Sequence, residues 1–187
     1  ESLRRSIVPI ELLEKRVRQE LDVGAAAAKR RQANEEHGQT VVQILAQHAP
    51  AAVMASLDEA YLDFTGTEQL YPVSLLPVAE RLRQEVSRET GLDSSIGIGP
   101  NRMIAKLASD YAKPRGICEV RAGWEEGFVA GLELRALPGI GPRTAEKLQR
   151  FGLTEVAQVQ RMSENELTRL LGDYARELKW RAHGHGS

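Results

Sequence analysis

The sequence contains a single cysteine, few aromatic residues and almost no excess of charge. The lone Cys118 excludes an internal disulfide and favours a reducing compartment. Aromatic residues make up 5% of the chain and the formal net charge is −1, so the basic excess typical of DNA-binding domains is absent in bulk. Any binding of nucleic acid must therefore come from local sites.

Long hydrophobic runs are missing as well. No apolar run approaches the roughly 20 residues that cross a bilayer, and no apolar core of a signal peptide follows residues 1–5. These absences predict an intracellular protein with no membrane partner. A hydrophobic fraction of 42% over 187 residues is enough for a core in one large domain or two small ones.

Patterns along the chain divide it into three predicted parts, residues 1–50, 51–120 and 121–187. The first part reads as helical, because an alanine run at 25–28 favours helix and an apolar stripe follows at 41–45. The third part shows short helices punctuated by glycine and proline. The second part has the order β-β-α-β-α-β, an α+β arrangement in which both helices are expected to cover one sheet face. Its predicted elements are Val53–Leu57, Tyr61–Phe64, Pro77–Thr90, Ser95–Ile98, a helix capped by Asn101, and Ile117–Val120.

Two adjacent carboxylates, Asp58 and Glu59, stand between the two short strands of a predicted hairpin. Carboxylate oxygens suit Mg²⁺, and two such ions can clamp the attacking and leaving oxygens of an in-line phosphoryl transfer. Strand alternation would place the two side chains on opposite faces, so both serve one site only if the turn redirects one of them. For an isolated Asp-Glu pair, a solvated acidic turn is the plainer alternative.

Residues 95–109 read S-I-G-I-G-P-N-R-M-I-A-K-L-A-S, a tight strand that passes through two glycines into a capped helix. Gly97 and Gly99 could cradle a phosphate at the helix N-terminus. They lack the third glycine and the acidic residue of a dinucleotide fingerprint, so close packing of strand on helix is the plainer explanation.

Residues 137–148 read L-P-G-I-G-P-R-T-A-E-K-L, in which two glycines around one apolar residue predict a tight hairpin. Backbone N–H groups of such a hairpin can point at a phosphate, and the positive dipole end of the next helix adds to the attraction. A basic pair at i, i+4 could flank the DNA backbone. Nothing in this arrangement reads base edges, so we predict sequence-independent binding. An ordinary turn between core helices is the alternative. The candidate DNA-binding residues are Gly139, Ile140, Gly141, Arg143, Thr144 and Lys147.

Several other residues receive plainer interpretations. His183 and His185 lack the further ligands of a structural zinc site and are expected to lie in a flexible tail. Trp124 and Trp180 are expected to be packing residues and not platforms for base stacking, and Lys106 is expected to be a charge on a helix surface.

Three segments, 56–63, 95–116 and 137–148, resemble in order the motifs of Y-family, translesion DNA polymerases of the polymerase IV and kappa type. The resemblance covers residues 41 to 187 and implies a catalytic palm with a ferredoxin-like sheet, followed by a helical thumb with a helix-hairpin-helix motif. It implies that Asp58 and Glu59 are catalytic ligands of Mg²⁺ and that Lys113 contacts the incoming triphosphate. It also implies that primer-template DNA and deoxynucleoside triphosphates are partners, with a sliding clamp reached through other regions.

One feature of that family has no counterpart here, a strand near the N-terminus with a third metal-binding aspartate. The fingers also have no counterpart, and residues 1–40 match poorly. We therefore expect an incomplete two-metal site and a chain that is a weak catalyst alone. The alternative is a non-catalytic helix-hairpin-helix DNA-binding or scaffold protein with a decayed palm. The expected location is the nucleus in a eukaryote and the cytoplasm in a prokaryote.

Overall fold

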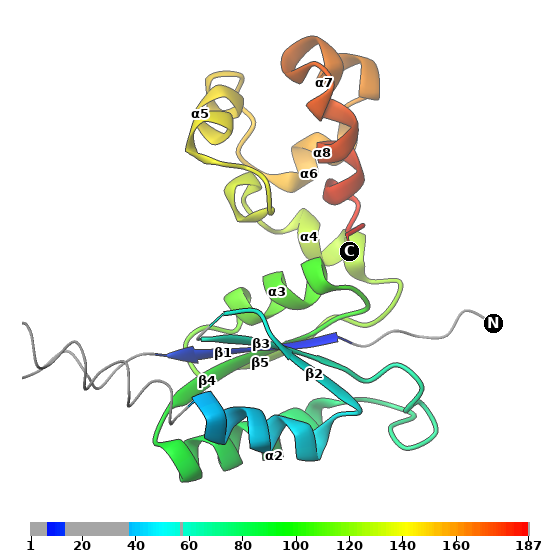
Figure 1. Ribbon diagram of the computed structural model, residues 1–187. Helices are drawn as coiled ribbons and strands as arrows, with labels where there is room; N and C mark the ends of the chain where they lie inside the picture. The colour runs from blue at the N-terminus through cyan, green and yellow to red at the C-terminus, as the bar shows by residue number, and fades with distance from the viewer. Residues whose placement is uncertain (1–6, 14–37, 57, 187) are drawn as a thin grey trace, which may run out of the picture.

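The computed structural model describes residues 7–13, 38–56 and 58–186 (Figure 1). The described chain forms a sheet region with helices on both of its faces, followed by a helical region that begins near residue 121. The predicted fold class, an α+β sheet followed by a small all-helical part, is confirmed.

Five strands form one sheet in the order β2-β3-β1-β4-β5. All neighbouring pairs are antiparallel except β4 and β5, which are parallel. With the helix over residues 38–48 and α2 (Leu76–Thr90), the first four strands give the βαββαβ order of a ferredoxin-like unit. The strands are β1 (Ile7–Leu13), β2 (Ala51–Met54), β3 (Glu59–Asp63), β4 (Asp93–Ile98) and β5 (Ile117–Glu119).

The central strand β1 corrects the expectation that residues 1–50 are helical. Residues 38–48 are a helix as predicted, but β1 pairs with both β3 and β4. Pro9 sits where only β3 is a neighbour, because pairing with β4 begins at Ile10. A proline, which has no N–H to donate, fits such a singly paired position better than a doubly paired one. The alanine run at 25–28 lies outside the described residues.

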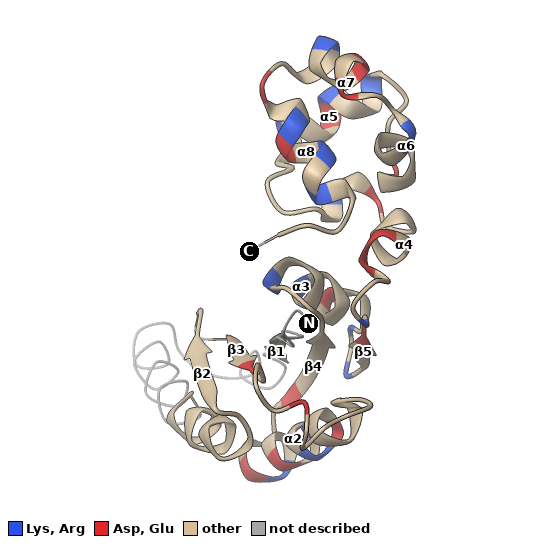
Figure 2. Ribbon diagram, turned by 90° about the vertical axis from the view of Figure 1, so that its right-hand side faces the viewer, with Lys and Arg blue, Asp and Glu red and all other residues tan. Residues whose placement is uncertain are grey.

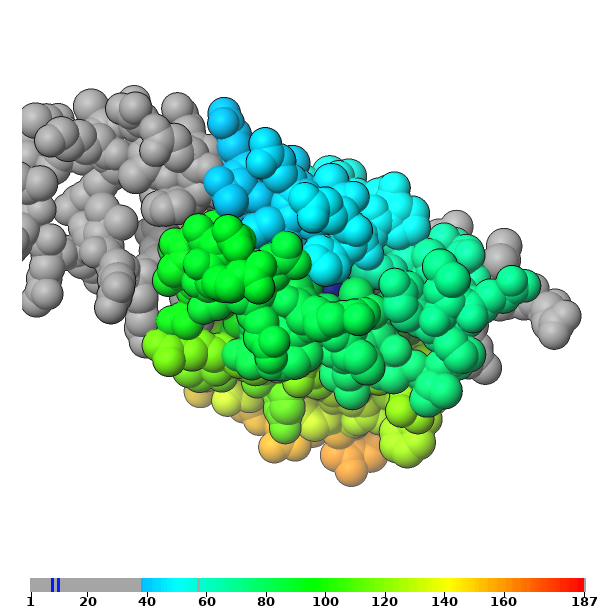
Figure 3. Space-filling view, turned by 90° about the horizontal axis from the view of Figure 1, so that it is seen from below, coloured from blue at the N-terminus to red at the C-terminus, as the bar shows by residue number. Residues whose placement is uncertain are grey.

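The two faces of the sheet are covered by different helices. Val8, Leu62 and Ile96 point into one hydrophobic cluster together with α2 and the helix over 38–48. Figure 3 looks onto this face, where those two helices hide almost all of β1. Helix α3 (Arg102–Tyr111) lies on the opposite face (Figure 1), which corrects the expectation that it shares a face with α2.

The helical region contains no strand among residues 121–186, as predicted, and its hydrophobic core continues into α3. Met103, Ile104 and Leu107 of α3 belong to the same buried cluster as Leu148 and Leu178. No helix in the described segments is long and apolar enough to cross a membrane. The elements of this region are α4 (Glu125–Ala130), the 3-10 helix η1 (Leu134–Ala136), α5 (Pro142–Arg150), α6 (Val156–Arg161), α7 (Glu164–Leu171) and α8 (Tyr174–Ala182).

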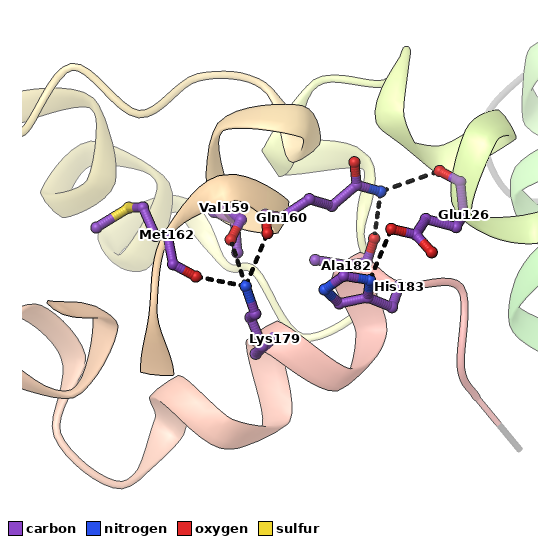
Figure 4. Close-up of polar contacts among 7 residues, drawn as sticks. All are labelled: Glu126, Val159, Gln160, Met162, Lys179, Ala182 and His183. Carbon is purple, nitrogen blue, oxygen red and sulfur yellow. Dashed lines mark hydrogen bonds and ion pairs between the residues drawn. The ribbon is translucent and has the colours of Figure 1, made fainter. Parts of the chain in front are cut away.

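Polar side chains join three of these helices (Figure 4). The Lys179 ammonium group of α8 donates to the carbonyl oxygens of Val159 at 3.3 Å, Gln160 at 2.8 Å and Met162, and so caps the C-terminal end of α6. The Gln160 side chain donates to the carbonyl oxygens of Glu126 and Ala182, at 2.9 and 2.7 Å. These contacts hold α4, α6 and α8 together.

The segment after α8 is ordered against its neighbours, which corrects the expectation of a flexible tail. Asn101 Nδ2 donates to the Gly184 carbonyl oxygen at 3.0 Å, and His183 Nδ1 lies 2.9 Å from Glu126 Oε1. The His185 ring stacks on Trp180 with centroids 5.6 Å apart. The end of the helical region therefore contacts the start of α3.

The two tryptophans, which were expected to be packing residues, lie largely at the surface. Trp124 is 72% exposed and Trp180 is 46% exposed, so neither is a core residue.

Candidate functional site

The acidic pair lies in the predicted hairpin, between β2 and β3. The carbonyl of Glu59 accepts hydrogen bonds from the N–H groups of Ala55, at 2.8 Å, and Ser56, at 3.2 Å, which close the turn. Asp58 is exposed and precedes β3, so strand alternation does not fix the direction of its side chain. Its carboxylate accepts a hydrogen bond from Ser56 Oγ at 2.6 Å.

Glu59 belongs to the sheet face that α3 covers. Its neighbours Ala60 and Leu62 are buried in the cluster with α2, so Glu59 and Tyr61 point to the other face. There Lys106 Nζ of α3 lies 3.9 Å from Glu59 Oε2. Arg102 of the same helix lies over the Tyr61 ring, 5.0 Å from its centroid.

A series of charges leads from Glu59 along α3. Asp110 Oδ2 lies 3.5 Å from Lys106 Nζ, and Asp110 Oδ1 accepts a hydrogen bond from Lys113 Nζ at 2.6 Å. The structure therefore links the predicted metal ligand to the predicted triphosphate-binding lysine through two side chains. Sequence reasoning treated Lys106 as a surface charge. The i, i+4 and i, i+3 spacings of Lys106, Asp110 and Lys113 are the signal that could have found this series.

The glycines before α3 allow that helix to lie close to the sheet. A Cβ at Gly97 would collide with the Ala105 carbonyl oxygen and the Ser109 nitrogen, and a Cβ at Gly99 would lie 2.8 Å from the Ala105 nitrogen. Asn101 caps the helix, since its Oδ1 accepts a hydrogen bond from the Ile104 N–H at 2.9 Å. Strand–helix packing thus accounts for both glycines, and Lys106 is held over the strand that carries Glu59.

The chemistry of the acidic pair fits a hard divalent cation, because both side chains offer carboxylate oxygens next to an exposed turn. Within residues 7–13, 38–56 and 58–186, no group of three or more His, Cys, Asp and Glu side chains is arranged to hold a metal ion. In the backbone register, Glu11 of β1 stands opposite Glu59.

The predicted glycine hairpin is present before α5. Gly139 has a φ of +87°, and the Ile140 N–H donates to the Leu137 carbonyl oxygen at 3.2 Å. The Ile140 side chain is buried in the core of the helical region, so it anchors the hairpin from the inside. In the described part of the chain, the N–H groups of Gly139 and Gly141 have no hydrogen-bond partner.

Helix α5 begins directly after the hairpin. Gly141 is its N-cap residue and offers no side chain to cap the first turn. Arg143 and Thr144 lie in that first turn, where backbone N–H groups have no acceptor within the helix. The Arg143 and Lys147 side chains are exposed and one turn apart. Four backbone donors and the Arg143 side chain therefore gather at the N-terminal end of α5, an arrangement suited to phosphate, and Lys147 follows one turn further along the helix.

The structure keeps the two candidate sites apart. Figure 2 shows β3 in the sheet region and α5 in the helical region, on opposite sides of α3. The acidic pair, Lys106 and Lys113 form one group, and the hairpin residues form another.

Comparison with solved structures gives the class of the fold. The chain superposes on the post-insertion binary complex of Dbh DNA polymerase with a TM-score of 0.76 and 20% identity, covering 97% of this chain and 68% of that one. DinB from Sulfolobus solfataricus gives a TM-score of 0.73 at 19% identity, with the same two coverages. The chain therefore shares the fold of these two polymerases over nearly its whole length.

Sequence comparison gives the family. The model of the impB/mucB/samB family matches residues 7–110. DNA polymerase IV of Colwellia psychrerythraea is 37% identical over 149 residues, which are 80% of this chain and 42% of the relative. DNA polymerase IV of Shewanella sp. strain MR-4 is 39% identical over 155 residues, 83% of this chain and 43% of the relative.

The chain belongs to the impB/mucB/samB family, that of the Y-family DNA polymerases, and the resemblance seen in the sequence is confirmed. The family match begins at residue 7, which corrects the expectation that the resemblance starts near 41. The chain spans about two fifths of the length of the curated relatives it matches.

Proposed function

We propose that this chain supplies the palm and thumb of a lesion-bypass DNA polymerase that carries out template-directed nucleotidyl transfer on primer-template DNA. The observation that carries the proposal is the placement of Glu59, next to the exposed Asp58 and 3.9 Å from Lys106, on the sheet face that α3 covers. Paired carboxylates beside cations suit a reaction in which a polyphosphate is held and cleaved.

In this proposal Asp58 and Glu59 hold Mg²⁺, which supplies positive charge to the reacting phosphate when it is bound. Lys113 neutralises charge on the β- and γ-phosphates of a deoxynucleoside triphosphate. Asp110 lies between two cations and pairs with both, Lys106 near the carboxylates and Lys113 near the nucleotide.

The hairpin at 138–141 and the first turn of α5 hold the duplex through its phosphates. Gly139, Gly141, Arg143 and Thr144 offer backbone N–H groups, and Lys147 adds charge. Ile140 supports this site from the core. Contacts to phosphate carry no sequence information, as a polymerase that moves along its template requires. The protein would act inside the cell, in the bacterial cytoplasm if its source is like that of its relatives. Contact with a sliding clamp stays a prediction.

Primer extension in the presence of Mg²⁺ tests the catalytic assignment. The native sequence is compared with Asp58→Ala/Glu59→Ala and with Glu89→Ala, an exposed carboxylate on α2, which covers the other face of the sheet from Glu59. A second set of the same proteins carries an N-terminal strand with an aspartate, taken from a relative. We expect the double substitution to abolish extension and Glu89→Ala to leave it unchanged.

Duplex binding, measured in parallel by fluorescence anisotropy, separates the two candidate functions. If Asp58→Ala/Glu59→Ala still extends the primer, the two carboxylates have no part in the mechanism. Binding without extension in every protein, including the set with the added strand, would favour the non-catalytic DNA-binding or scaffold function.

A further inference from the structure

Arg181 of α8 contacts the glycine hairpin from a distant part of the sequence. Its Nη1 donates a hydrogen bond to the Pro138 carbonyl oxygen, and its Nη2 lies 2.7 Å from Glu177 Oε1, one turn earlier in the same helix. The Arg181 side chain is 25% exposed. The guanidinium group is therefore held between its own helix and the hairpin.

The hairpin fits closely against this side chain. A Cβ at Gly139 would collide with Arg181 Nη1 and would lie 3.3 Å from the Tyr174 hydroxyl oxygen. The absence of a side chain at residue 139 lets the guanidinium and the phenol approach the backbone. The positive φ of Gly139 gives a second reason for glycine at this position.

The hydrogen bond from Arg181 fixes the direction of one peptide group. The bond between Pro138 and Gly139 is trans, so its C=O and N–H point in opposite directions. Because the Pro138 carbonyl points inward to Arg181, the Gly139 N–H points away from α8. The next N–H, that of Ile140, is already used in the turn to Leu137.

We propose that Arg181 is a positioning residue for DNA binding, which holds the 138–139 peptide so that the Gly139 N–H faces a backbone phosphate. This inference rests on the proposed function, because it names a residue that prepares the duplex-binding hairpin. Arg181 acts through the hairpin, and its own charge is taken up by the Pro138 carbonyl and Glu177.

The test uses the full chain with Arg181→Met, which keeps a long apolar side chain and removes the donors. Arg176→Met is the matched control, because Arg176 is an exposed arginine on α8 that pairs with Glu164. Affinity for a short blunt-ended duplex is measured at several salt concentrations. We expect Arg181→Met to lower the affinity about tenfold, as for the loss of one charge-assisted contact, and Arg176→Met to leave it unchanged.

The salt dependence separates positioning from direct contact. A cation that touches phosphate contributes about 0.9 to the slope of log K against log salt concentration. A positioning role leaves this slope unchanged in Arg181→Met. A slope reduced by about that amount would overturn the proposal and make Arg181 a phosphate ligand.

Nuclear magnetic resonance gives a readout that a general loss of stability would not move. We expect the duplex to shift the Gly139 amide signal in the native sequence and in Arg176→Met, but not in Arg181→Met. Arg181→Lys keeps a donor and should restore part of the shift, which also covers the case in which Arg181→Met unfolds. A shift of Gly139 that is unchanged in a folded Arg181→Met would overturn the proposal.

The carbonyl ¹³C shift of Pro138 in the DNA-free chain keeps this test separate from the proposed function. It should change in Arg181→Met and not in Arg176→Met, whether or not the duplex binds. A native chain that fails to bind duplex would contradict the proposed function alone. An unchanged Pro138 signal in Arg181→Met would contradict the positioning role alone.

Discussion

Gly97 is a single residue whose small size decides how closely α3 approaches the sheet. The sequence interpretation, that this glycine serves strand–helix packing, is confirmed by the contacts that a Cβ would make with Ala105 and Ser109. Both of those contacts are with backbone atoms, which cannot rotate away as a side chain can. Whatever relieves the contact must move the helix that carries Lys106.

Gly97→Ala is therefore expected to lower the free energy of unfolding by about 2–3 kcal/mol, the upper range for overpacking a core. Gly127→Ala is the control, since Gly127 lies in α4 with no heavy atom within 4 Å of an added Cβ. That substitution should be neutral or stabilise by about 0.5–1 kcal/mol, because alanine favours helix. Urea denaturation measures both. Equal effects at the two positions would contradict the packing argument.

Cys118 offers a second test at the scale of one residue. Burial, with a smaller contribution from the neighbouring Glu119 carboxylate, raises the pKa of the Cys118 thiol above its usual value. A raised pKa keeps the thiol protonated, and the thiolate is the reactive form. Alkylation by iodoacetamide at neutral pH should therefore be slower in the folded chain than in urea, and should accelerate only at more alkaline pH. Equal rates in the folded and unfolded chain would contradict this.

Residue-level prediction succeeded where a local signal exists and failed where contact depends on the fold. The cap at Asn101 could be read from the sequence because it joins residues three apart. The approach of Lys106 to Glu59 could not, since it requires knowing which face of β3 lies under α3. The roles of Asp58, Glu59 and Lys113 came from the resemblance to a family and stay predictions.

At the scale of elements, short-range patterns predicted most of the sheet region. Four elements lie within a few residues of their predicted bounds: β2 and β3 of the hairpin, α2, and β4. Gly91, in the left-handed conformation, ends α2 as predicted. Strand β1 was missed because a seven-residue segment containing a proline has no clear period, and its partners lie far along the chain.

The capping of α6 by Lys179 gives a prediction for one element. Lys179→Met leaves three carbonyl groups at the end of α6 without this donor and is expected to cost about 1–3 kcal/mol of stability. Lys147→Met on exposed α5 is the matched control and should stay within about 0.5 kcal/mol of the native chain. Thermal denaturation followed by circular dichroism compares the two. A Lys179→Met chain as stable as the control would show that the cap contributes nothing.

At the scale of the whole molecule, the contact between the end of the helical region and the start of α3 was not predictable. Two histidines around a glycine suggest a flexible tail. No local sequence pattern predicts that Asn101 donates a hydrogen bond to the Gly184 carbonyl oxygen. Asn101 therefore serves both regions, with Oδ1 capping α3 and Nδ2 holding residue 184.

Asn101→Asp separates these two roles. Aspartate keeps an oxygen that caps α3, but it replaces the donor to Gly184 with a second acceptor. We expect the amides of residues 183–186 to exchange faster with solvent while those of α3 keep their protection, as measured by hydrogen exchange. Asn101→Ala loses both roles. It should lower the free energy of unfolding by about 1 kcal/mol more than Asn101→Asp does, because the cap of α3 is lost as well. Unchanged exchange at 183–186 in Asn101→Asp would mean that this hydrogen bond does not hold the segment.

The shared cluster around α3 also bears on how this sequence can change over time. The helix packs against Gly97 of the sheet and, through Leu107, against the core of the helical region, so its position is constrained from two sides. A substitution that suits one neighbour must still suit the other. In a large library selected for new behaviour at the 138–141 hairpin, substitutions should therefore accumulate on α5 and on the outer surface of α8. The inward-facing positions of α3 should stay nearly unchanged.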